Sequence, residues 1–345
     1  MVLRIVIVAP PFYEVPPDGY GGTELVCGLL ADGLAGLGHE VTVIGAGARR
    51  TQADFVATSA SPRPEGGERA LRCEIEHAAR AAALIAEMRP AIVHDHTSVG
   101  PLTAAFSPFP TVATVHGAIR GPDAVAGPLP VTGRWCHLVA VSAAQRDDAP
   151  ELPWAAVVHN GVDTTRYQAL ADREDYVLYL GRVSPYKGTV DAIVAAQAAG
   201  RRLVIAGSWT TPAERAYFDA EIRPRLGPRV EWVGPVGMAA KASLLSRAAC
   251  LIFPARWHEP FGLVLVEAMA SGTPVVALRA GAVAELVPDG IAGVLCDTPG
   301  ELPAAIEAAA GIDGQAARAH AVRHFGADTM TRRYLRLYQR LSASG

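Results

Sequence analysis

The feature that most constrains this chain is a regular alternation of short apolar runs with longer segments of helical pattern. Each run is rich in Val and Ile, which is typical of a strand buried on both faces. Strands and helices in alternation predict parallel sheets joined by crossover helices. The runs are Ile5–Val8, Val41–Ile44, Ala91–Val93, Thr111–Val115, Leu138–Val141, Tyr176–Leu180, Leu203–Ala206, Val230–Val233, Cys250–Phe253 and Pro274–Ala277.

The alternation occurs twice, and a break separates the two halves near residues 159–175. The break begins with the turn-forming pair Asn160-Gly161 and continues with polar residues. We therefore predict an α/β protein with two facing, Rossmann-like, doubly wound parallel-sheet domains and a cleft between them. The domains are residues 1–160 and 161–326, and residues 327–345 form a C-terminal helix that packs back on the first domain. Ligands of such sheets bind beyond the carboxyl ends of the strands.

Composition excludes several classes of protein. The chain has 345 residues, of which 50% are hydrophobic and 19% charged, so it can bury two cores and is not predicted to be disordered. The net charge is -3 and no basic stripe interleaved with aromatics is evident, so nucleic acid is not an expected partner. Five scattered cysteines without a CxxC pair favour reduced thiols and a cytoplasmic protein.

No apolar run approaches the length of a membrane span. The C-terminal segment Ala327–Leu341 has arginines interspersed with apolar residues. We favour a terminal helix that packs its apolar side on the protein, and contact with a membrane surface remains the alternative.

The strongest motif runs from Glu259 to Glu267 and follows the apolar run Cys250–Phe253. Pro260 places the helix start after it, so Phe261, Gly262 and Leu263 are predicted to form the first turn. The N–H groups of a first turn lack intrahelical acceptors and attract anionic groups. Glu267 lies one turn further along the same face. Two carboxylates thus bracket a helix start, where they can accept hydrogen bonds from sugar hydroxyls.

The competing interpretation of this motif is a capped helix with surface glutamates. Glu267, however, sits in an otherwise apolar helix. A buried carboxylate without a partner is costly, and we therefore predict a ligand as its partner.

A second motif, Gly181-Arg182 followed by Lys187-Gly188, comes directly after the run Tyr176–Leu180. Two permanent cations near a strand end suit a diphosphate. A surface Arg and Lys would be the ordinary explanation, but the pairing with the Glu259–Glu267 motif favours a binding site.

These two motifs together resemble those of family 4 of the retaining glycosyltransferases, which have two facing Rossmann-like domains, the GT-B fold. The resemblance covers nearly the whole chain and implies an acceptor-side first domain and a nucleotide-sugar donor domain after it. It implies that Arg182 and Lys187 hold the donor diphosphate, that Glu267 holds the ribose and that Glu259 faces the donor sugar. The donor-binding residues it implies are Gly21, Gly22, Gly181, Arg182, Lys187, Val233, Glu259, Phe261, Gly262, Leu263 and Glu267.

The first half of the chain contributes three further candidates. Gly21 and Gly22 precede a helical run at Leu25–Leu37 and resemble the family's glycine-rich turn over the donor phosphates. His116 follows the run Thr111–Val115 and resembles the histidine that contacts the donor sugar in the family. We take His116, Arg182, Lys187 and Glu259 as the catalytic candidates.

The acceptor side is predicted less directly. Tyr13 and Glu14 lie in a proline-stiffened loop that could touch an acceptor or serve only as a rigid surface loop. His94 and His96 could be acceptor-side or structural. Their spacing could also suit a metal, but we see no further ligands, and no metal site is predicted.

The resemblance implies transfer from a nucleotide-diphosphate sugar, with UDP favoured and GDP next, to a hydroxyl of a glycan, a glycolipid or a secondary metabolite. The expected mechanism is retaining front-face transfer without a metal or other cofactor. Two alternatives remain, a sugar-nucleotide epimerase of the same architecture and a non-catalytic nucleotide-sugar-binding protein. The segment Gly45–Arg50 resembles a dinucleotide fingerprint only superficially, because it follows the second strand and lacks the last glycine.

Overall fold

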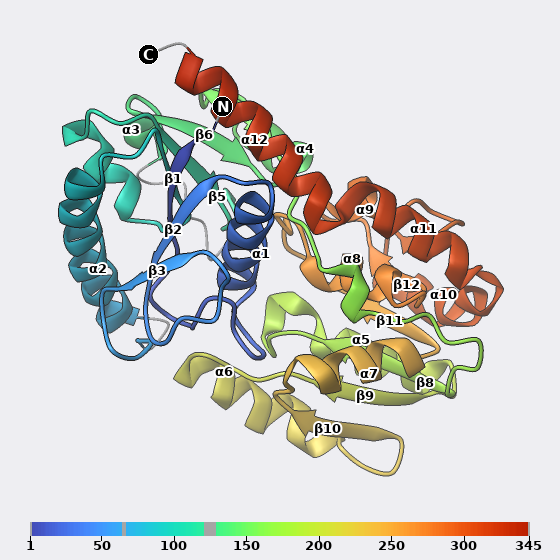
Figure 1. The fold of residues 1–345 in the computed structure, drawn as a ribbon. Helices are drawn as coiled ribbons and strands as arrows, with labels where there is room; N and C mark the ends of the chain where they lie inside the picture. Colours follow the sequence, from blue (N-terminus) through green and yellow to red (C-terminus); the bar gives the residue numbers. More distant parts are fainter. Residues whose placement is uncertain (1, 64–66, 121–128, 344–345) are drawn as a thin grey trace. The chain divides into compact units, whose positions relative to one another are not determined.

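The computed structural model describes residues 2–63, 67–120 and 129–343. The chain forms two compact units. Unit 1 comprises Met1–Gly161 and Ala327–Gly345, and unit 2 comprises Val162–Gly326. In each unit a parallel sheet is flanked by helices (Figure 1). No helix among the described residues is long and apolar enough to cross a membrane.

Unit 1 is built on a seven-stranded sheet with the order β3-β2-β1-β4-β5-β6-β7, and all neighbouring strands are parallel. The central strands are almost entirely buried, and most of their residues are apolar. The strands are β1 (Arg4–Val8), β2 (Glu40–Gly45), β3 (Asp54–Ala57), β4 (Ile92–Asp95), β5 (Thr111–Val115), β6 (Cys136–Ala140) and β7 (Trp154–Val157).

The helices of unit 1 include the C-terminal helix, which returns to pack against the first helix of the chain. The contact is close at Gly33, where a Cβ atom would lie 2.4 Å from the Thr331 hydroxyl oxygen. The main helices are α1 (Gly22–Gly36), α2 (Gly67–Met88), α3 (Leu129–Thr132), α4 (Ala143–Asp147) and α12 (Ala327–Ala343).

Unit 2 repeats the architecture with a six-stranded parallel sheet of the order β10-β9-β8-β11-β12-β13. Its strands are β8 (Tyr176–Leu180), β9 (Arg202–Ala206), β10 (Val230–Gly234), β11 (Cys250–Phe253), β12 (Val275–Leu278) and β13 (Gly293–Cys296). Its helices are α5 (Thr189–Ala198), α6 (Pro212–Tyr217), α7 (Met238–Arg247), α8 (Leu263–Ala270), α9 (Val283–Leu286), α10 (Leu302–Ala308) and α11 (Gly314–Phe325).

The strand order of both sheets reverses once, between β1 and β4 in unit 1 and between β8 and β11 in unit 2. The crossover helices leave in opposite directions at such a point, so a crevice opens there beyond the carboxyl ends of the two strands. Residues that follow β8 and β11 are therefore expected to meet in unit 2, and both charged motifs lie there.

Every apolar run named from the sequence forms a strand within a residue or two of its predicted ends, and the two parallel α/β domains are confirmed. Three strands were missed, namely β3, β7 and β13. All three lie at sheet edges, where a strand pairs with one neighbour only. β3 and β7 are only partly buried, and β3 has just three apolar residues in a row. β7 is apolar throughout, so its run was present in the sequence and was not recognised as a strand.

Candidate active site

The loops after β8 and β11 are held against each other in unit 2. Gly188 follows Lys187 with φ +73°, and a Cβ atom there would lie 2.2 Å from the Pro254 carbonyl oxygen. The Arg256 amide donates a hydrogen bond to the Tyr186 carbonyl across 3.0 Å. Only glycine permits this approach, which brings the two predicted motifs together at the point where the strand order reverses.

Lys187 and Glu259 form an ion pair between these two loops. The ammonium Nζ lies 2.7 Å from Oε2 of Glu259, and both side chains are largely buried. The Trp257 indole N–H donates to the same oxygen at 2.8 Å, and the ammonium lies 4.2 Å from the centre of the Trp257 ring. The carboxylate, the cation–π contact and the indole together fix the position of Lys187.

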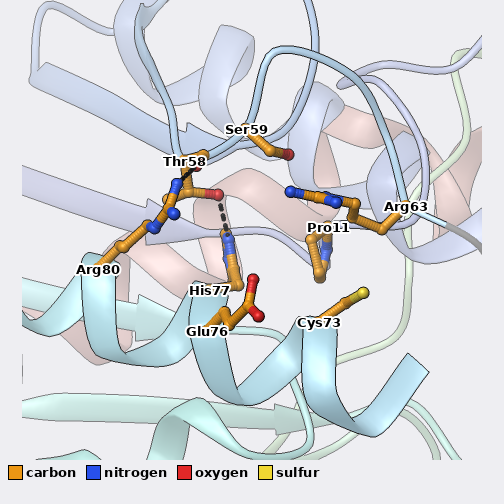
Figure 2. A pocket seen from close by; sticks show the side chains of 8 residues that line it. All are labelled: Pro11, Thr58, Ser59, Arg63, Cys73, Glu76, His77 and Arg80. Atoms are coloured by element: carbon orange, nitrogen blue, oxygen red, sulfur yellow. Dashed lines mark hydrogen bonds between the residues drawn. The ribbon is translucent and has the colours of Figure 1, made fainter. Parts of the chain in front are cut away.

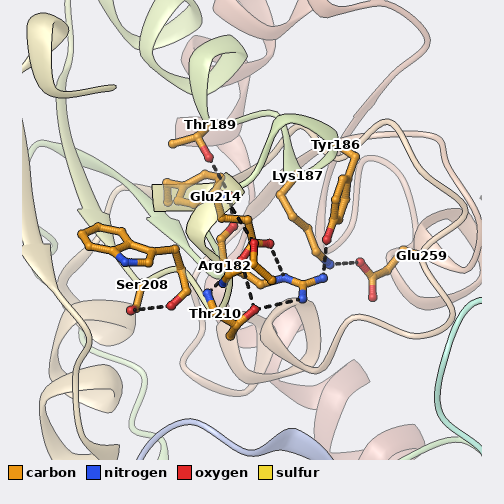
Figure 3. A network of polar contacts seen from close by, with 11 residues as sticks. Arg182, Tyr186, Lys187, Thr189, Ser208, Thr210, Glu214 and Glu259 are labelled. Carbon is orange, nitrogen blue, oxygen red and sulfur yellow. Dashed lines mark hydrogen bonds and ion pairs between the residues drawn. The ribbon is translucent and has the colours of Figure 1, made fainter. Parts of the chain in front are cut away.

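Arg182 lies in the same network but pairs with a residue that the sequence did not single out (Figure 3). Its Nε lies 3.2 Å from Oε1 of Glu214, and its guanidinium donates to the Tyr186 hydroxyl. The other Glu214 oxygen accepts from the amide and hydroxyl of Thr210 and the amide of Thr211, at 2.8, 3.0 and 3.2 Å. Glu214 is thus anchored at the start of α6, and it holds one edge of the guanidinium.

The start of α8 differs from the prediction. The helix begins at Leu263, so Phe261 and Gly262 precede its first turn. Gly262 is the N-cap residue, with φ +88°, a left-handed conformation that cannot continue a helix. The loop before it is fixed at Glu259, whose carbonyl accepts from the Ala282 amide at 2.9 Å.

Glu267 is buried in α8 as predicted, but it already has partners within the chain. Its Oε1 lies 2.5 Å from Nζ of Lys241 in α7 and accepts from the Tyr167 hydroxyl at 2.9 Å. Burial and the neighbouring carboxylate raise the pKa of Tyr167, which keeps its hydroxyl a donor. The argument that Glu267 needs a ligand to offset its burial is therefore wrong, because Lys241 supplies the opposite charge.

Two other predicted donor residues, Gly181 and Val233, lie at the carboxyl ends of strands in unit 2. Gly181 directly follows β8, and its amide donates to the Ala206 carbonyl at 3.1 Å. Val233 lies on β10, an edge strand, and is 39% exposed.

In unit 1 the predicted phosphate turn precedes α1. Gly22 opens the helix, and Gly21 is its N-cap residue with φ +123°. A Cβ atom at Gly21 would lie 2.9 Å from Cγ of Tyr13, so this glycine lets the turn pack on that ring. Glu14 forms an ion pair with Arg50 at 2.5 Å. Tyr13 and Glu14 are both half-buried, which gives the loop that contains them a defined structure.

Three histidines of unit 1, His94, His96 and His116, lie together at the ends of β4 and β5. His116 is half-buried, and desolvation lowers its pKa to about 4. Its Nε2 lies 2.8 Å from Nδ1 of His96. His94 and His96 are both buried, and desolvation holds their pKa values well below 6.5. His94 has protein partners on both ring nitrogens, which supports the structural interpretation over the acceptor-side one.

A small pocket lies elsewhere in unit 1 (Figure 2). None of the residues predicted from the sequence lines it. The lining residues are Pro11, Thr58, Ser59, Arg63, Cys73, Glu76, His77 and Arg80. Within the described ranges, no group of three or more His, Cys, Asp or Glu side chains is arranged to hold a metal ion.

Sequence reasoning missed four residues that support the predicted site: Tyr167, Lys241, Glu214 and Gln145. Lys241 is one of only two lysines in the chain, and its place on a largely apolar helix was the available signal. Glu214 was signalled by Thr211-Pro212-Ala213-Glu214, a capping-box sequence. Tyr167 had no local signal, because its partner Glu267 is remote in sequence. The same holds for the contacts of the Gln145 side-chain amide with Val115 and Gly117.

Unit 2 thus presents two cations, two carboxylates and a helix start at the carboxyl ends of β8 and β11. The chemistry of these groups suits a phosphate-bearing ligand with hydroxyl groups, so we take this arrangement as the candidate site. The comparisons agree with that class. Residues 20–166 match the family model "Glycosyltransferase Family 4", and residues 163–313 match "Glycosyl transferases group 1".

Relatives extend the match over most of the chain. It is 30% identical to an alpha-maltose-1-phosphate synthase of Mycobacterium tuberculosis over 337 residues, which cover 82% of each chain. The structure of AviGT4, a glycosyltransferase involved in avilamycin A biosynthesis, is 30% identical and has a TM-score of 0.79 over 99% of both chains. The chain therefore belongs to glycosyltransferase family 4 and has the GT-B type of fold.

One relative with higher identity is matched over a shorter stretch. The glycogen synthase of Mycobacterium tuberculosis is 32% identical over 240 residues, and the match covers 60% of this chain and 56% of that enzyme. The chain thus spans little more than half of that relative's length.

Proposed function

We propose that this protein transfers a sugar from a nucleotide-diphosphate sugar to an acceptor hydroxyl, with retention of the anomeric configuration and without a metal ion. The observation that carries the proposal is the pairing of Lys187 with Glu259 at 2.7 Å, where the strand order of unit 2 reverses. Family membership supports it, because the two motifs that meet there are those expected of the donor site.

Each side chain has a role that its contacts support. Arg182 and Lys187 supply the positive charge for the diphosphate, and the positive end of the α8 dipole adds to it. Glu259 and Glu267 each use only one carboxylate oxygen in the contacts among described residues. The second oxygen of each can accept from hydroxyls, at the donor sugar for Glu259 and at the ribose for Glu267.

The reaction breaks the bond between the anomeric carbon and the phosphate oxygen and forms a bond from that carbon to the acceptor oxygen on the same face. The leaving phosphate oxygen takes the acceptor proton. Positive charge around the phosphates stabilises the departing nucleotide diphosphate, while the sugar passes through an oxocarbenium-like transition state. Fixed cations can do this without a metal. The acceptor is a hydroxyl of a glycan, a glycolipid or a secondary metabolite.

The first experiment is calorimetric titration of the full chain with UDP, GDP, ADP and dTDP, with UDP as the expected ligand. Glu267→Gln is the control variant, because the amide preserves shape and can still accept from Tyr167. We expect one nucleotide to bind and the variant to bind it much more weakly. Failure of all four nucleotides to bind would overturn the proposal.

Turnover of the matching nucleotide sugar then separates the enzyme classes. We expect Lys187→Ala and Arg182→Ala to lose most of the turnover, and the wild-type activity to survive EDTA. Product analysis should show a new glycosidic bond with the donor's anomeric configuration. An epimerised nucleotide sugar, binding without any turnover, or a strict need for a divalent metal would contradict the proposal.

A further inference from the structure

A cluster of three histidines in unit 1 has an arrangement that family membership does not explain. β4 and β5 are neighbours in the sheet, with His94 opposite Val112. His94 lies within β4, His96 directly follows that strand, and His116 directly follows β5. The two parallel strands end side by side, and the three rings form a row from the core to the half-buried His116.

The inner end of the row is fixed by the C-terminal helix. Nδ1 of His94 lies 2.5 Å from the hydroxyl of Tyr338 in α12, and its Nε2 lies 2.7 Å from the Thr114 hydroxyl. Thr114 in turn lies 2.8 Å from the hydroxyl of Tyr334, also in α12. All four side chains are buried, so the ring of His94 has a single position.

His96 lies between this fixed ring and His116. Its ring centre is 3.9 Å from that of His94 and 5.1 Å from that of His116, and its plane lies within 24° of the His116 plane. Nδ1 of His96 is hydrogen-bonded to Nε2 of His116 at 2.8 Å. Nε2 of His96 is buried and has no partner among the described residues. Its one polar contact through the ring is therefore with His116.

The backbone on either side of His116 is fixed separately. The side-chain amide of Gln145 donates to the carbonyls of Val115 and Gly117, at 2.9 and 2.8 Å. Its oxygen accepts from the Val141 amide at 2.8 Å. Gln145 is 1% exposed, so these bonds are shielded from water. The main chain at His116 is thus held from α4, and the ring is left to be oriented by His96.

We propose that His96 is a positioning residue, which holds the His116 ring in one rotamer and one tautomer. The inference rests on the proposed function, in which His116 is a catalytic candidate. Both imidazoles are neutral at pH 7, so one proton lies between the two facing nitrogens. Nε2 of His96 is buried without a partner among the described residues, and an unsatisfied N–H there would cost more than a bare nitrogen. The shared proton therefore lies on Nδ1 of His96, which donates to Nε2 of His116 and leaves the ring proton of His116 on its Nδ1. A ring held in this way loses no free energy to reorientation when substrate binds.

The experiment compares His96→Leu, His96→Asn and the wild type. Leucine removes the hydrogen bond, whereas the asparagine amide keeps a polar group near the position of Nδ1. His137→Leu is the matched control, because His137 is a half-buried histidine on β6, the strand next to β5. We expect His96→Leu to lower kcat by about 10- to 100-fold with little change in donor KM. His96→Asn should recover most of that loss, and His137→Leu should behave as wild type.

The second readout does not depend on turnover. Nitrogen NMR of the protein labelled in its histidine rings, with His116 assigned from His116→Gln, should show one neutral tautomer in the wild type. His96→Leu should give a mixture of the two neutral tautomers, because water can then form a hydrogen bond with either ring nitrogen of His116. An unchanged tautomer, an unchanged kcat, or a failure of asparagine to rescue would overturn the inference. UDP affinity should be the same in all variants, and its absence in the wild type would instead point to failure of the proposed function.

Discussion

Removing the charge of Lys241 gives the sharpest test of how unit 2 tolerates a buried carboxylate. Nζ of Lys241 lies 2.5 Å from Oε1 of Glu267, and the two side chains are only 13% and 4% exposed. The proposed variant, Lys241→Met, keeps the length of the side chain but leaves the carboxylate without its counter-charge. Breaking a buried pair from one side costs about 3–5 kcal/mol.

The structure places the expected loss at the lower end of that range. The Tyr167 hydroxyl still donates to Oε1 at 2.9 Å in the variant, so the carboxylate retains one strong hydrogen bond. We therefore expect unit 2 to lose about 3 kcal/mol of stability. For a domain of this size that loss lowers the unfolding midpoint by about 6–12 °C.

The assay is thermal unfolding of the full chain, followed by circular dichroism. Arg223→Met is the control, because it removes an ion pair with Asp219 whose side chains are 63% and 43% exposed, and such pairs contribute about 1 kcal/mol or less. The double variant Lys241→Met/Glu267→Gln should recover most of the loss, because the amide carries no charge. A midpoint for Lys241→Met no lower than that of the control, or no recovery in the double variant, would refute the reasoning.

Three further changes test other parts of the structure. Gly281→Ala should destabilise unit 2 by about 1–3 kcal/mol in chemical denaturation and lower turnover, because the new Cβ would lie 2.4 Å from the amide nitrogen and carbonyl oxygen of Glu259 at φ +57°. Glu214→Gln should raise donor KM several-fold without loss of helix content, because glutamine retains the capping box but not the charge that holds Arg182. His77→Asn should reduce the loss of stability on acidification, because burial lowers the pKa of His77 from 6.5 to about 4.

The sign of the pH effect follows from the protons bound. Between pH 6.5 and pH 4 the unfolded chain binds a proton at His77 that the folded chain does not, so stability falls as the pH falls through this window. The free energy of unfolding lost through His77 across this window is about 3 kcal/mol. Denaturant unfolding at several pH values measures this loss. An equal dependence of stability on pH in His77→Asn and the wild type would contradict the lowered pKa of His77.

The other two variants have their own contrary results. These are wild-type stability of Gly281→Ala and an unchanged donor KM of Glu214→Gln.

The sequence by itself determined the architecture. Buried parallel strands must be apolar on both faces, so strands such as β5, β8 and β11 were predicted to the residue. Edge strands follow this rule less closely, and three of the four edge strands were missed. β13 begins at Gly293, where a Cβ atom would lie 2.2 Å from the Val275 carbonyl oxygen, so the position requires glycine. A glycine adds nothing to an apolar pattern, which left β13 with a shorter apolar run.

Sequence also located the charged motifs of unit 2, because each follows a strand that could be predicted. It could not tell which charges pair. Arg182 was predicted to hold the donor diphosphate, and its ion pair with Glu214 was not predicted. Glu267 was predicted to need a ligand, and the structure pairs it with Lys241.

Tertiary structure alone decided these partners, because an ion pair depends on which helices and loops the sheet brings together. The same holds for His96, which the sequence could describe only as acceptor-side or structural. Its contact with His116 arises because β4 and β5 are adjacent, and the ring behind it is fixed by tyrosines of α12, more than 200 residues further along the chain. Local patterns specify each strand and helix through its own burial, whereas the contacts of a polar side chain are specified by the fold.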